Sequence, residues 1–373
     1  MRIVYVCADR GIPLLGDKGA SVHLRSLSAA LAKRGNEVCL ACHNLTGQNP
    51  TPVGVKVALL PDPGQDGEKW LSAFCREMGA EVVMERYSLS SSQGRAAATS
   101  LGIPLVLEVN APLVDEAARY RNLDDLDNWR AWERRILSGA DRVIGVSAGI
   151  KSHLESLGVE AKRITVIHNG ANVLRFRGSD GAAVRARHHL GRALVIGFSG
   201  SLKPWHGVDS LLEAVASLSS RPRLLIVGDG PQADTLRRQS VTLGIADRTT
   251  FAGAVPHHLM PGYLGAMDLG VAPYVAQSEF YFSPLKVVEY LAAGLPVVAT
   301  DQGDLKELVG DAGILVPAGD IPSLARALGG LCADAAERRR LSAAAGARSL
   351  DYDWGSIAER VESVLRAAHR VAA

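Results

Sequence analysis

Short runs of apolar, mostly β-branched residues alternate with segments of helical period along the whole chain. Nearly continuous apolar runs are typical of strands buried on both faces of a parallel sheet. We expect strands at Ile3–Ala8, Glu37–Cys42, Val55–Leu60, Val82–Arg86, Pro104–Asn110, Arg142–Ser147, Ile164–His168, Ala193–Gly200, Arg223–Asp229, Thr249–Ala254, Leu269–Tyr274, Pro296–Thr300 and Gly313–Val316. Helices are expected between them, among others at Ala20–Arg34, Val208–Leu218, Gln232–Leu243 and Leu285–Ala293. This alternation predicts βαβ units and an α/β fold with parallel sheets.

The pattern that opens the chain starts again near its middle. A strand, a turn containing Gly16 and Gly19 and a helix come first, and Ala193–Gly200, Gly207 and a helix repeat that order. Between the two halves, residues 175–189 are polar, basic and poorly periodic, as in a hinge.

We therefore predict two doubly wound domains, residues 1–174 and 175–350. The helical pattern within 351–373 is a C-terminal helix that can cross back to the first domain. Open α/β sheets bind ligands beyond the carboxyl ends of their strands, so we expect the two domains to face a central cleft.

Composition removes several classes of protein. Of the 373 residues, 47% are apolar and 21% charged, a balance that excludes bulk disorder. The net charge of +2 is too small to suggest nucleic acid as a partner. No apolar stretch approaches the ~20 residues of a membrane span, and Met1 leads directly into a strand. We expect a cytoplasmic protein, with contact at a membrane surface left open.

The segment 279–300 contains the clearest chemical signal. Ser283 suits a helix N-cap and Pro284 the first helical position. Lys286 then falls in the first turn, where the helix dipole disfavours a cation unless an anion such as phosphate binds there. The alternative is a lysine that extends into solvent. Glu289, on the same helix face, either pairs with Lys286 or accepts hydrogen bonds from ribose hydroxyls.

Six segments together resemble the retaining glycosyltransferases of family 4, which have the two-domain GT-B architecture. They are Gly19–Leu24, Val166–Asn172, Gly200–Gly207, Val227–Pro231, Phe251–Val255 and Ser283–Ala299. Each glycine-containing segment is weak evidence alone, but their common order over nearly the whole chain is specific. The resemblance implies transfer of a sugar from a nucleotide sugar, most often a UDP-sugar, with GDP, dTDP and ADP left open.

The sequence departs from the family pattern at several positions. Glu289 matches the second of the two signature glutamates, but the first falls on Tyr281, two residues from Glu279. The usual arginine and lysine of the second-domain glycine loop fall on Ser201 and His206.

We infer that Lys203 and Lys286 replace the positive charge lost at these two positions. A histidine found in some relatives corresponds to Asn110.

The resemblance also implies the site residues. Contacts to the nucleotide sugar are expected from Gly19, Ser201, Lys203, His206, Gly228, Val255, Phe282, Ser283, Pro284, Leu285, Lys286 and Glu289. The residues expected to take part in catalysis are Lys286, Glu289, Asn110 and Glu108. For Asn110 and Glu108 a structural role at the end of a strand is equally consistent. His23 either contacts a hydroxyl or phosphate or is simply a residue of the helix face.

No metal and no tightly bound cofactor are expected. Lysines and helix N-termini can stabilise the charge that develops on the leaving diphosphate. The pairs Asp125/Asp127 and Asp351/Asp353 are short patterns in polar surroundings, typical of capping or solvated residues.

The resemblance implies retention of anomeric configuration. The acceptor is expected to be a small molecule, a glycan or a lipid-linked molecule, and its identity stays open. The alternatives are a sugar-nucleotide epimerase of the same fold and a non-catalytic sugar-binding protein with two domains.

Overall fold

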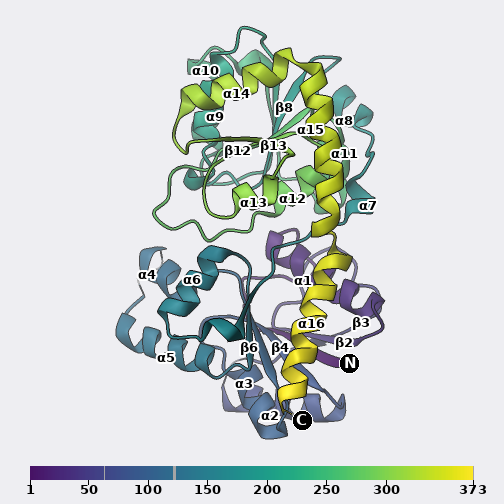
Figure 1. Ribbon diagram of the computed structural model, residues 1–373, viewed down its shortest axis with the longest axis vertical. Coiled ribbons are helices and arrows are strands. Elements are labelled where there is room, and N and C mark those ends of the chain that lie inside the picture. Colours follow the sequence, from purple (N-terminus) through teal and green to yellow (C-terminus); the bar gives the residue numbers. More distant parts are fainter. Residues whose placement is uncertain (63, 121–122, 373) are drawn as a thin grey trace. The chain divides into compact units, whose positions relative to one another are not determined.

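The computed structural model describes residues 1–62, 64–120 and 123–372, which form two parallel sheets with helices on both faces (Figure 1). Every expected strand is present. Central strands such as β1 (Arg2–Cys7), β5 (Leu105–Val109) and β8 (Val195–Ser199) are buried along almost their whole length, whereas β3 (Val55–Leu59) and β10 (Thr249–Gly253), at the edges of the sheets, are only partly buried. The predicted α/β class with two doubly wound domains is confirmed.

The first sheet has the strand order β3-β2-β1-β4-β5-β6-β7. Its strands are β1 (Arg2–Cys7), β2 (Glu37–Cys42), β3 (Val55–Leu59), β4 (Val82–Arg86), β5 (Leu105–Val109), β6 (Arg142–Gly145) and β7 (Ile164–Val166). The order reverses between β1 and β4, which is the topological switch point at which such sheets bind ligands.

Helices cover both faces of this sheet. The chain contributes α1 (Gly19–Lys33), α2 (Gln65–Glu77), α3 (Gln93–Leu101), α4 (Leu113–Tyr120), α5 (Leu126–Ser138), α6 (Ala148–Ser156) and α16 (Trp354–Ala372). Side chains of α2, α3, α5 and α6 share one core with the strands, and α1 and α16 pack together against the sheet.

The second sheet has the order β10-β9-β8-β11-β12-β13. Its strands are β8 (Val195–Ser199), β9 (Arg223–Val227), β10 (Thr249–Gly253), β11 (Leu269–Ala272), β12 (Val297–Thr300) and β13 (Gly313–Val316). The reversal between β8 and β11 repeats the arrangement of the first sheet.

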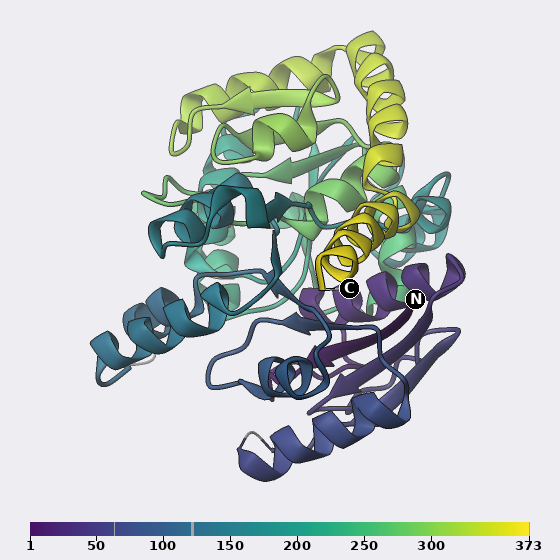
Figure 2. The same cartoon turned by 60° about the horizontal axis from the view of Figure 1, so that its bottom comes forward.

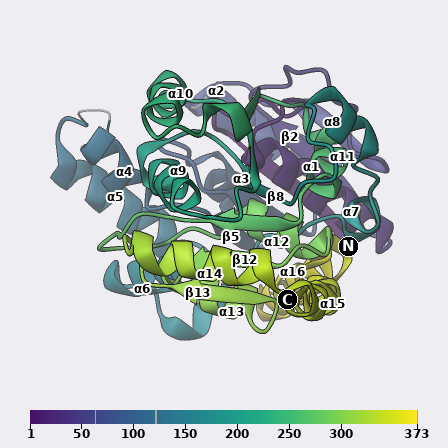
Figure 3. The same ribbon diagram turned by 90° about the horizontal axis from the view of Figure 1, so that it is seen from above.

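The second sheet also has helices on both faces. They are α7 (Val173–Phe176), α8 (Ala182–Arg187), α9 (Val208–Ala216), α10 (Ala233–Thr242), α11 (Met260–Gly265), α12 (Leu285–Ala292), α13 (Leu305–Val309), α14 (Ile321–Ala333) and α15 (Ala335–Arg348). Figure 3 shows α14 lying along β12 and β13, in the core that α9 and α10 share. On the opposite face, Tyr290 of α12 packs against Gly270 of β11. Short 3₁₀ helices span Ala161–Arg163, Pro204–His206, Ala246–Arg248, His257–Leu259 and Ser349–Tyr352.

Contacts divide the chain into two units. The first unit consists of Met1–Asn169, Tyr281–Ser283 and Trp354–Ala373, and the second of Gly170–Phe280 and Pro284–Asp353. The chain first passes from one unit to the other after Asn169, close to the domain boundary expected after residue 174. Two of the crossings flank Tyr281–Ser283, inside the segment with the strongest chemical signal.

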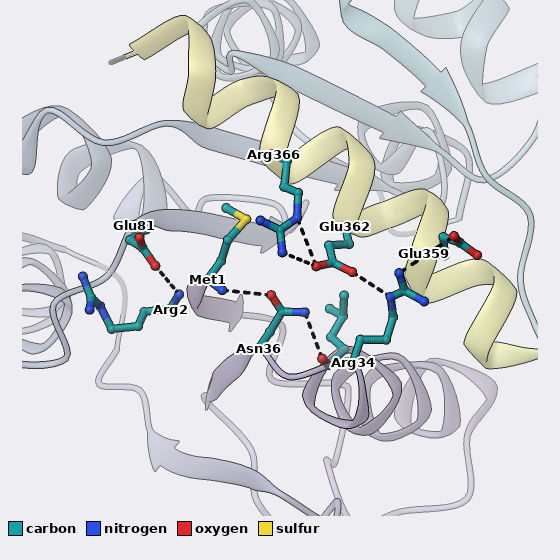
Figure 4. Close-up of polar contacts among 9 residues, drawn as sticks. Met1, Arg2, Arg34, Asn36, Glu81, Glu359, Glu362 and Arg366 are labelled. Atoms are coloured by element: carbon teal, nitrogen blue, oxygen red, sulfur yellow. Dashed lines mark hydrogen bonds and ion pairs between the residues drawn. The ribbon is translucent and has the colours of Figure 1, made fainter.

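The last helix, α16, lies beside α1 in the first unit (Figures 1 and 2). Figure 4 shows polar contacts that join them: Glu362 accepts hydrogen bonds from Arg34, the C-cap residue of α1, at 2.6 Å, and from Arg366. Apolar side chains of α16, including Ile357, Val361 and Leu365, are buried. Within the described part of the chain, none of the helices combines the length and the apolar character needed to cross a membrane.

Candidate active site

The site in the second unit centres on the start of α12. This helix begins at Leu285, with Pro284 in the N-cap position and no side chain capping it. The expected assignment of Ser283 as N-cap and Pro284 as first helical residue is therefore wrong by one residue. The Ser283 hydroxyl instead accepts a hydrogen bond from the backbone N–H of Asn169, at 2.9 Å. As a result, the N-cap residue of α12 makes no side-chain hydrogen bond to the first N–H groups of the helix.

Lys286 does not extend into solvent as one interpretation expected. It is 9% exposed, and its Nζ lies 4.0 Å from the ring centre of Phe198 and 5.2 Å from that of Tyr274. Among the described residues, Nζ has neither a hydrogen-bond partner nor an ion pair. Burial lowers the pKa of Lys286 to about 7, and the nearby charge of Glu289 offsets this only in part. A buried ammonium of this kind is costly unless an anion accompanies it.

Gly200 makes room for this ammonium. A Cβ on Gly200, which has φ of +133°, would lie 2.8 Å from the Lys286 Nζ. At the neighbouring strand end, a Cβ on Gly228 would lie 1.9 Å from the Gly200 carbonyl oxygen. The two glycines therefore bring the backbones after β8 and β9 close together beside Lys286.

His206 lies beside the same aromatic rings as Lys286. Its ring centre is 5.4 Å from that of Tyr274 and 6.1 Å from that of Phe198, and Nδ1 is hydrogen-bonded to the Ser201 carbonyl. Burial, with the charges of Lys286 and Lys203, lowers the pKa of His206 to about 3, so the ring is neutral near pH 7. Lys203 itself lies over the Trp205 ring, at 5.5 Å.

Glu289 pairs with a residue that the sequence did not single out as its partner. His257 Nε2 lies 2.7 Å from Glu289 Oε1, and Glu289 is 7% exposed. Arg175 donates to the His257 carbonyl at 3.3 Å. Glu289 forms no ion pair with Lys286 within the described residues, so that interpretation is wrong. Val255 lies in the loop between β10 and the 3₁₀ helix that carries His257.

The first unit contains a second polar cluster, at the ends of β1, β4 and β5. Glu108 is 2% exposed and accepts from His23 at Oε1, at 2.5 Å, and from the Tyr5 hydroxyl at Oε2, at 2.6 Å. Burial alone would raise the pKa of Glu108, but His23, Arg86 and Tyr5 together lower it to about 2. Both oxygens of this carboxylate are thus occupied by protein donors.

Asn110, just beyond β5, has a buried Nδ2 without a hydrogen-bond partner among the described residues. Gly19 is the first residue of α1. Phe282 and Ser283 belong with the first unit, whereas Pro284 and Leu285 begin the second unit's part of the segment.

The structure thus gathers Ser201, Lys203, His206, Gly228, Lys286 and Glu289 in one unit, and Gly19, Glu108 and Asn110 in the other.

The aspartate pairs have different surroundings. Asp125 and Asp127 are exposed at the start of α5, and Asp353 accepts from the backbone N–H of Val173 at 3.2 Å. Across residues 1–62, 64–120 and 123–372, no group of three or more His, Cys, Asp or Glu side chains is arranged to hold a metal ion.

Comparison with known proteins identifies the family. Residues 18–175 match the model described as "Glycosyltransferase Family 4", and residues 193–334 match that described as "Glycosyl transferases group 1". A D-inositol 3-phosphate glycosyltransferase of Acidothermus cellulolyticus is 30% identical, covering 96% of this chain and 87% of its own. The chain belongs to glycosyltransferase family 4.

Other relatives of this family 4 glycosyltransferase have different names. A glycogen synthase of Mycobacterium tuberculosis is 27% identical over 99% of this chain and 95% of its own. Among solved structures, Anabaena HepE in complex with UDP has a TM-score of 0.79 at 21% identity, covering 98% of this chain and all of that one. Sucrose-phosphate synthase of Thermosynechococcus elongatus has a TM-score of 0.78 at 22% identity, covering 99% of each chain. The fold of this enzyme is GT-B.

Proposed function

We propose that this glycosyltransferase moves a sugar from a UDP-sugar to an acceptor hydroxyl with retention of anomeric configuration and without a metal ion. The observation that carries the proposal is Lys286, a buried ammonium without a partner among the described residues, next to the uncapped start of α12. A diphosphate bound there would accept hydrogen bonds from Nζ and from the first backbone N–H groups of the helix.

The same arrangement accounts for the departures from the family pattern in the glycine-containing loop Gly200–Gly207. Where the family usually has a lysine, His206 is neutral near pH 7, so it adds no positive charge to the site. Lys286 supplies a cation instead, and Lys203 supplies another from the loop after β8. As the bond to the anomeric carbon breaks, these charges would stabilise the leaving diphosphate.

The nucleoside is held, in this proposal, by Glu289. The bond to His257 occupies Oε1, and Oε2 accepts no hydrogen bond among the described residues. That oxygen is available for a ribose hydroxyl. Further contacts to the donor are proposed for Gly19, Ser201, Gly228, Val255, Phe282, Ser283, Pro284 and Leu285. UDP is favoured because similarly folded HepE was crystallised with UDP and with UDP-glucose.

The acceptor hydroxyl would attack from the face that the diphosphate leaves, and a phosphate oxygen would take its proton. Asn110 is proposed to donate its unpaired Nδ2–H to a substrate hydroxyl. Glu108, whose oxygens are both occupied, would contribute by holding His23 rather than by touching the sugar. We propose an acceptor of the polyol or sugar class, since several relatives are named D-inositol 3-phosphate glycosyltransferases.

Calorimetric titration with UDP, GDP, ADP and dTDP in the presence of EDTA tests the donor site. We expect UDP to bind selectively, and Lys286→Met to weaken UDP binding far more than uridine binding. The matched control is Lys306→Met, which removes an exposed lysine of the same unit. Equal UDP affinity in the Lys286 and Lys306 variants would contradict the phosphate site. Consumption of the UDP-sugar without transfer to any acceptor would instead favour an epimerase.

A further inference from the structure

His23 is a buried histidine whose two ring nitrogens both face acceptors. It lies in the second turn of α1 and is 4% exposed. Nε2 is 2.5 Å from Glu108 Oε1, and Nδ1 is 2.8 Å from Asn169 Oδ1. The first acceptor is a carboxylate, and the nature of the second depends on which way the Asn169 amide points.

Hydrogen bonds between Asn169 and Ser283 fix the orientation of the Asn169 amide. Asn169 Nδ2 donates to the Ser283 carbonyl oxygen at 2.6 Å, and the Asn169 backbone N–H donates to the Ser283 hydroxyl at 2.9 Å. Turning the amide over would bring two carbonyl oxygens together at 2.6 Å, which is repulsive. Oδ1 therefore faces His23.

Two acceptors on one imidazole require two N–H donors, which only the imidazolium has. In a neutral ring, the lone pair of Nδ1 would face the Asn169 oxygen, and a buried acceptor would be left without a donor.

The surroundings of the ring match a positive charge. Glu108 also accepts from Tyr5 and lies 3.8 Å from Arg86 Nη1. Burial raises the pKa of this carboxyl, but His23 itself, with Arg86 and Tyr5, lowers it to about 2. The Trp354 ring also lies against His23, edge-on with centroids 5.2 Å apart. Among the residues that the structure describes, the charged and titratable groups linked to His23 are Glu108 directly, with Arg86 and Tyr5 bonded to or close to Glu108.

The residues linked to His23 all lie at points where the chain passes between the two units. Asn169 is the last residue of the first unit before the chain enters the second. Ser283 ends the short Tyr281–Ser283 segment of the first unit, and Trp354 begins its final segment. His23 therefore contacts, directly or through Asn169, each segment that joins the first unit to the rest. One residue after Ser283, the chain reaches Pro284, the N-cap residue of α12.

We propose that His23 is a positioning residue: as an imidazolium it ties Glu108 to the Asn169–Ser283 pair and so holds the segment from which α12, with Lys286 and Glu289, begins. It is not a catalytic residue, because it is buried and both nitrogens are occupied by protein acceptors. The proposal rests on the proposed function only where UDP binding is the readout.

Nitrogen-15 spectra of histidine-labelled protein test the charge directly. We expect both ring nitrogens of His23 to be protonated at pH 7.5, with the signal assigned by its loss in His23→Phe. A neutral ring, with one protonated and one bare nitrogen, would overturn the proposal.

Hydrogen exchange and UDP titration test the positioning role. His23→Phe keeps a ring against Trp354 but removes both donors. Ser28→Ala alters a buried polar residue of the same helix whose hydroxyl donates to the Leu24 and Arg25 carbonyls of α1. For His23→Phe we expect exchange in residues 281–286 to rise about tenfold, or ~1.4 kcal/mol, and UDP affinity to fall at least threefold. Ser28→Ala should change neither.

Unchanged exchange or unchanged UDP affinity in a folded His23→Phe would refute the positioning role. If the wild-type protein binds no UDP, the proposed function fails. The spectra and the exchange data would still decide whether His23 is an imidazolium that holds this segment.

Discussion

Raising the pH should weaken the binding of UDP, because the side chain of Lys286 loses its proton. In the free protein, burial lowers the pKa of Lys286 to about 7, from an ordinary value of 10.5. A diphosphate in contact with Nζ favours the charged form and raises that pKa again. Binding at pH 8 to 9 must therefore be accompanied by uptake of a proton.

The magnitude follows from the size of that shift. Each pKa unit corresponds to about 1.4 kcal/mol, so full recovery of roughly three units would link ~4 kcal/mol of binding energy to this proton. The dissociation constant of UDP should rise nearly tenfold per pH unit between about pH 7.5 and 9.5. Below pH 7 this contribution should level off. His206 adds nothing in this window, since its pKa is about 3.

Calorimetry from pH 6.5 to 9.5, repeated in buffers of different ionisation enthalpy, measures both the affinity and the proton uptake. Lys286→Met should bind weakly at every pH and take up no proton, and Lys306→Met should behave like the wild type. A dissociation constant that stays constant from pH 7.5 to 9.5, with no proton uptake, would show that Lys286 does not bind the diphosphate.

Four further predictions concern other parts of the molecule. His257→Ala should reduce the preference for UDP over 2′-deoxy-UDP and 3′-deoxy-UDP severalfold, because the Glu289 carboxylate is then free to turn. Titration with all three nucleotides measures the preference, and an unaltered preference would contradict this role of His257. Asn110→Ala should lower the transfer rate about tenfold without lowering the melting temperature, since it removes a buried donor that has no partner among the described residues; a normal rate would leave Asn110 without a role in transfer. Glu362→Gln should lower the melting temperature at pH 7: burial raises the pKa of Glu362, but Arg34 and Arg366 lower it overall. The stabilisation is therefore present at neutral pH and lost as the pH falls below about 4, where the variant and the wild type should converge. Excess EDTA should leave the transfer rate within a factor of about two, and complete loss restored by Mg²⁺ or Mn²⁺ would contradict transfer without a metal.

The strands could be predicted because each is a short, mostly apolar run of a length that suits a parallel strand, even where a charged residue such as Lys56 or Glu108 interrupts it. The start of α12 was harder to locate. Ser283 and Pro284 fit the first positions of a helix by local preference, but Ser283 is already engaged by Asn169, so the helix begins at Leu285. A tertiary contact overrode the local preference by one residue.

The position of Lys286 in the first turn was predictable, but its burial was not. Whether a lysine in a first turn faces solvent or an aromatic ring depends on side chains from other parts of the fold, here Phe198 of β8 and Tyr274 after β11. His257 could not be recognised for a similar reason. An adjacent pair of histidines does not indicate a ligand site, and nothing local relates the loop after β10 to a carboxylate on α12.

The sequence indicated that His23 could have a role, but not which residues it contacts. It lies in the Gly19–Leu24 segment that resembles the family, and a polar side chain early in a helix after a glycine turn was a candidate for a ligand contact. Its protein partners come from β5, from the crossing after β7 and from α16, so sequence alone could not distinguish them from a substrate.

The contact of α16 with α1 has a consequence for synthesis on the ribosome. The unit that begins the chain lacks its last helix until residues 354–372 have been made, and until then the face of α1 that packs against α16 stays uncovered. The second unit consists of Gly170–Phe280 and Pro284–Asp353, so all of it is translated before α16. We therefore expect the half of the enzyme that is translated first to be the last to finish folding, and the fragment 1–169 to aggregate more readily than 170–353.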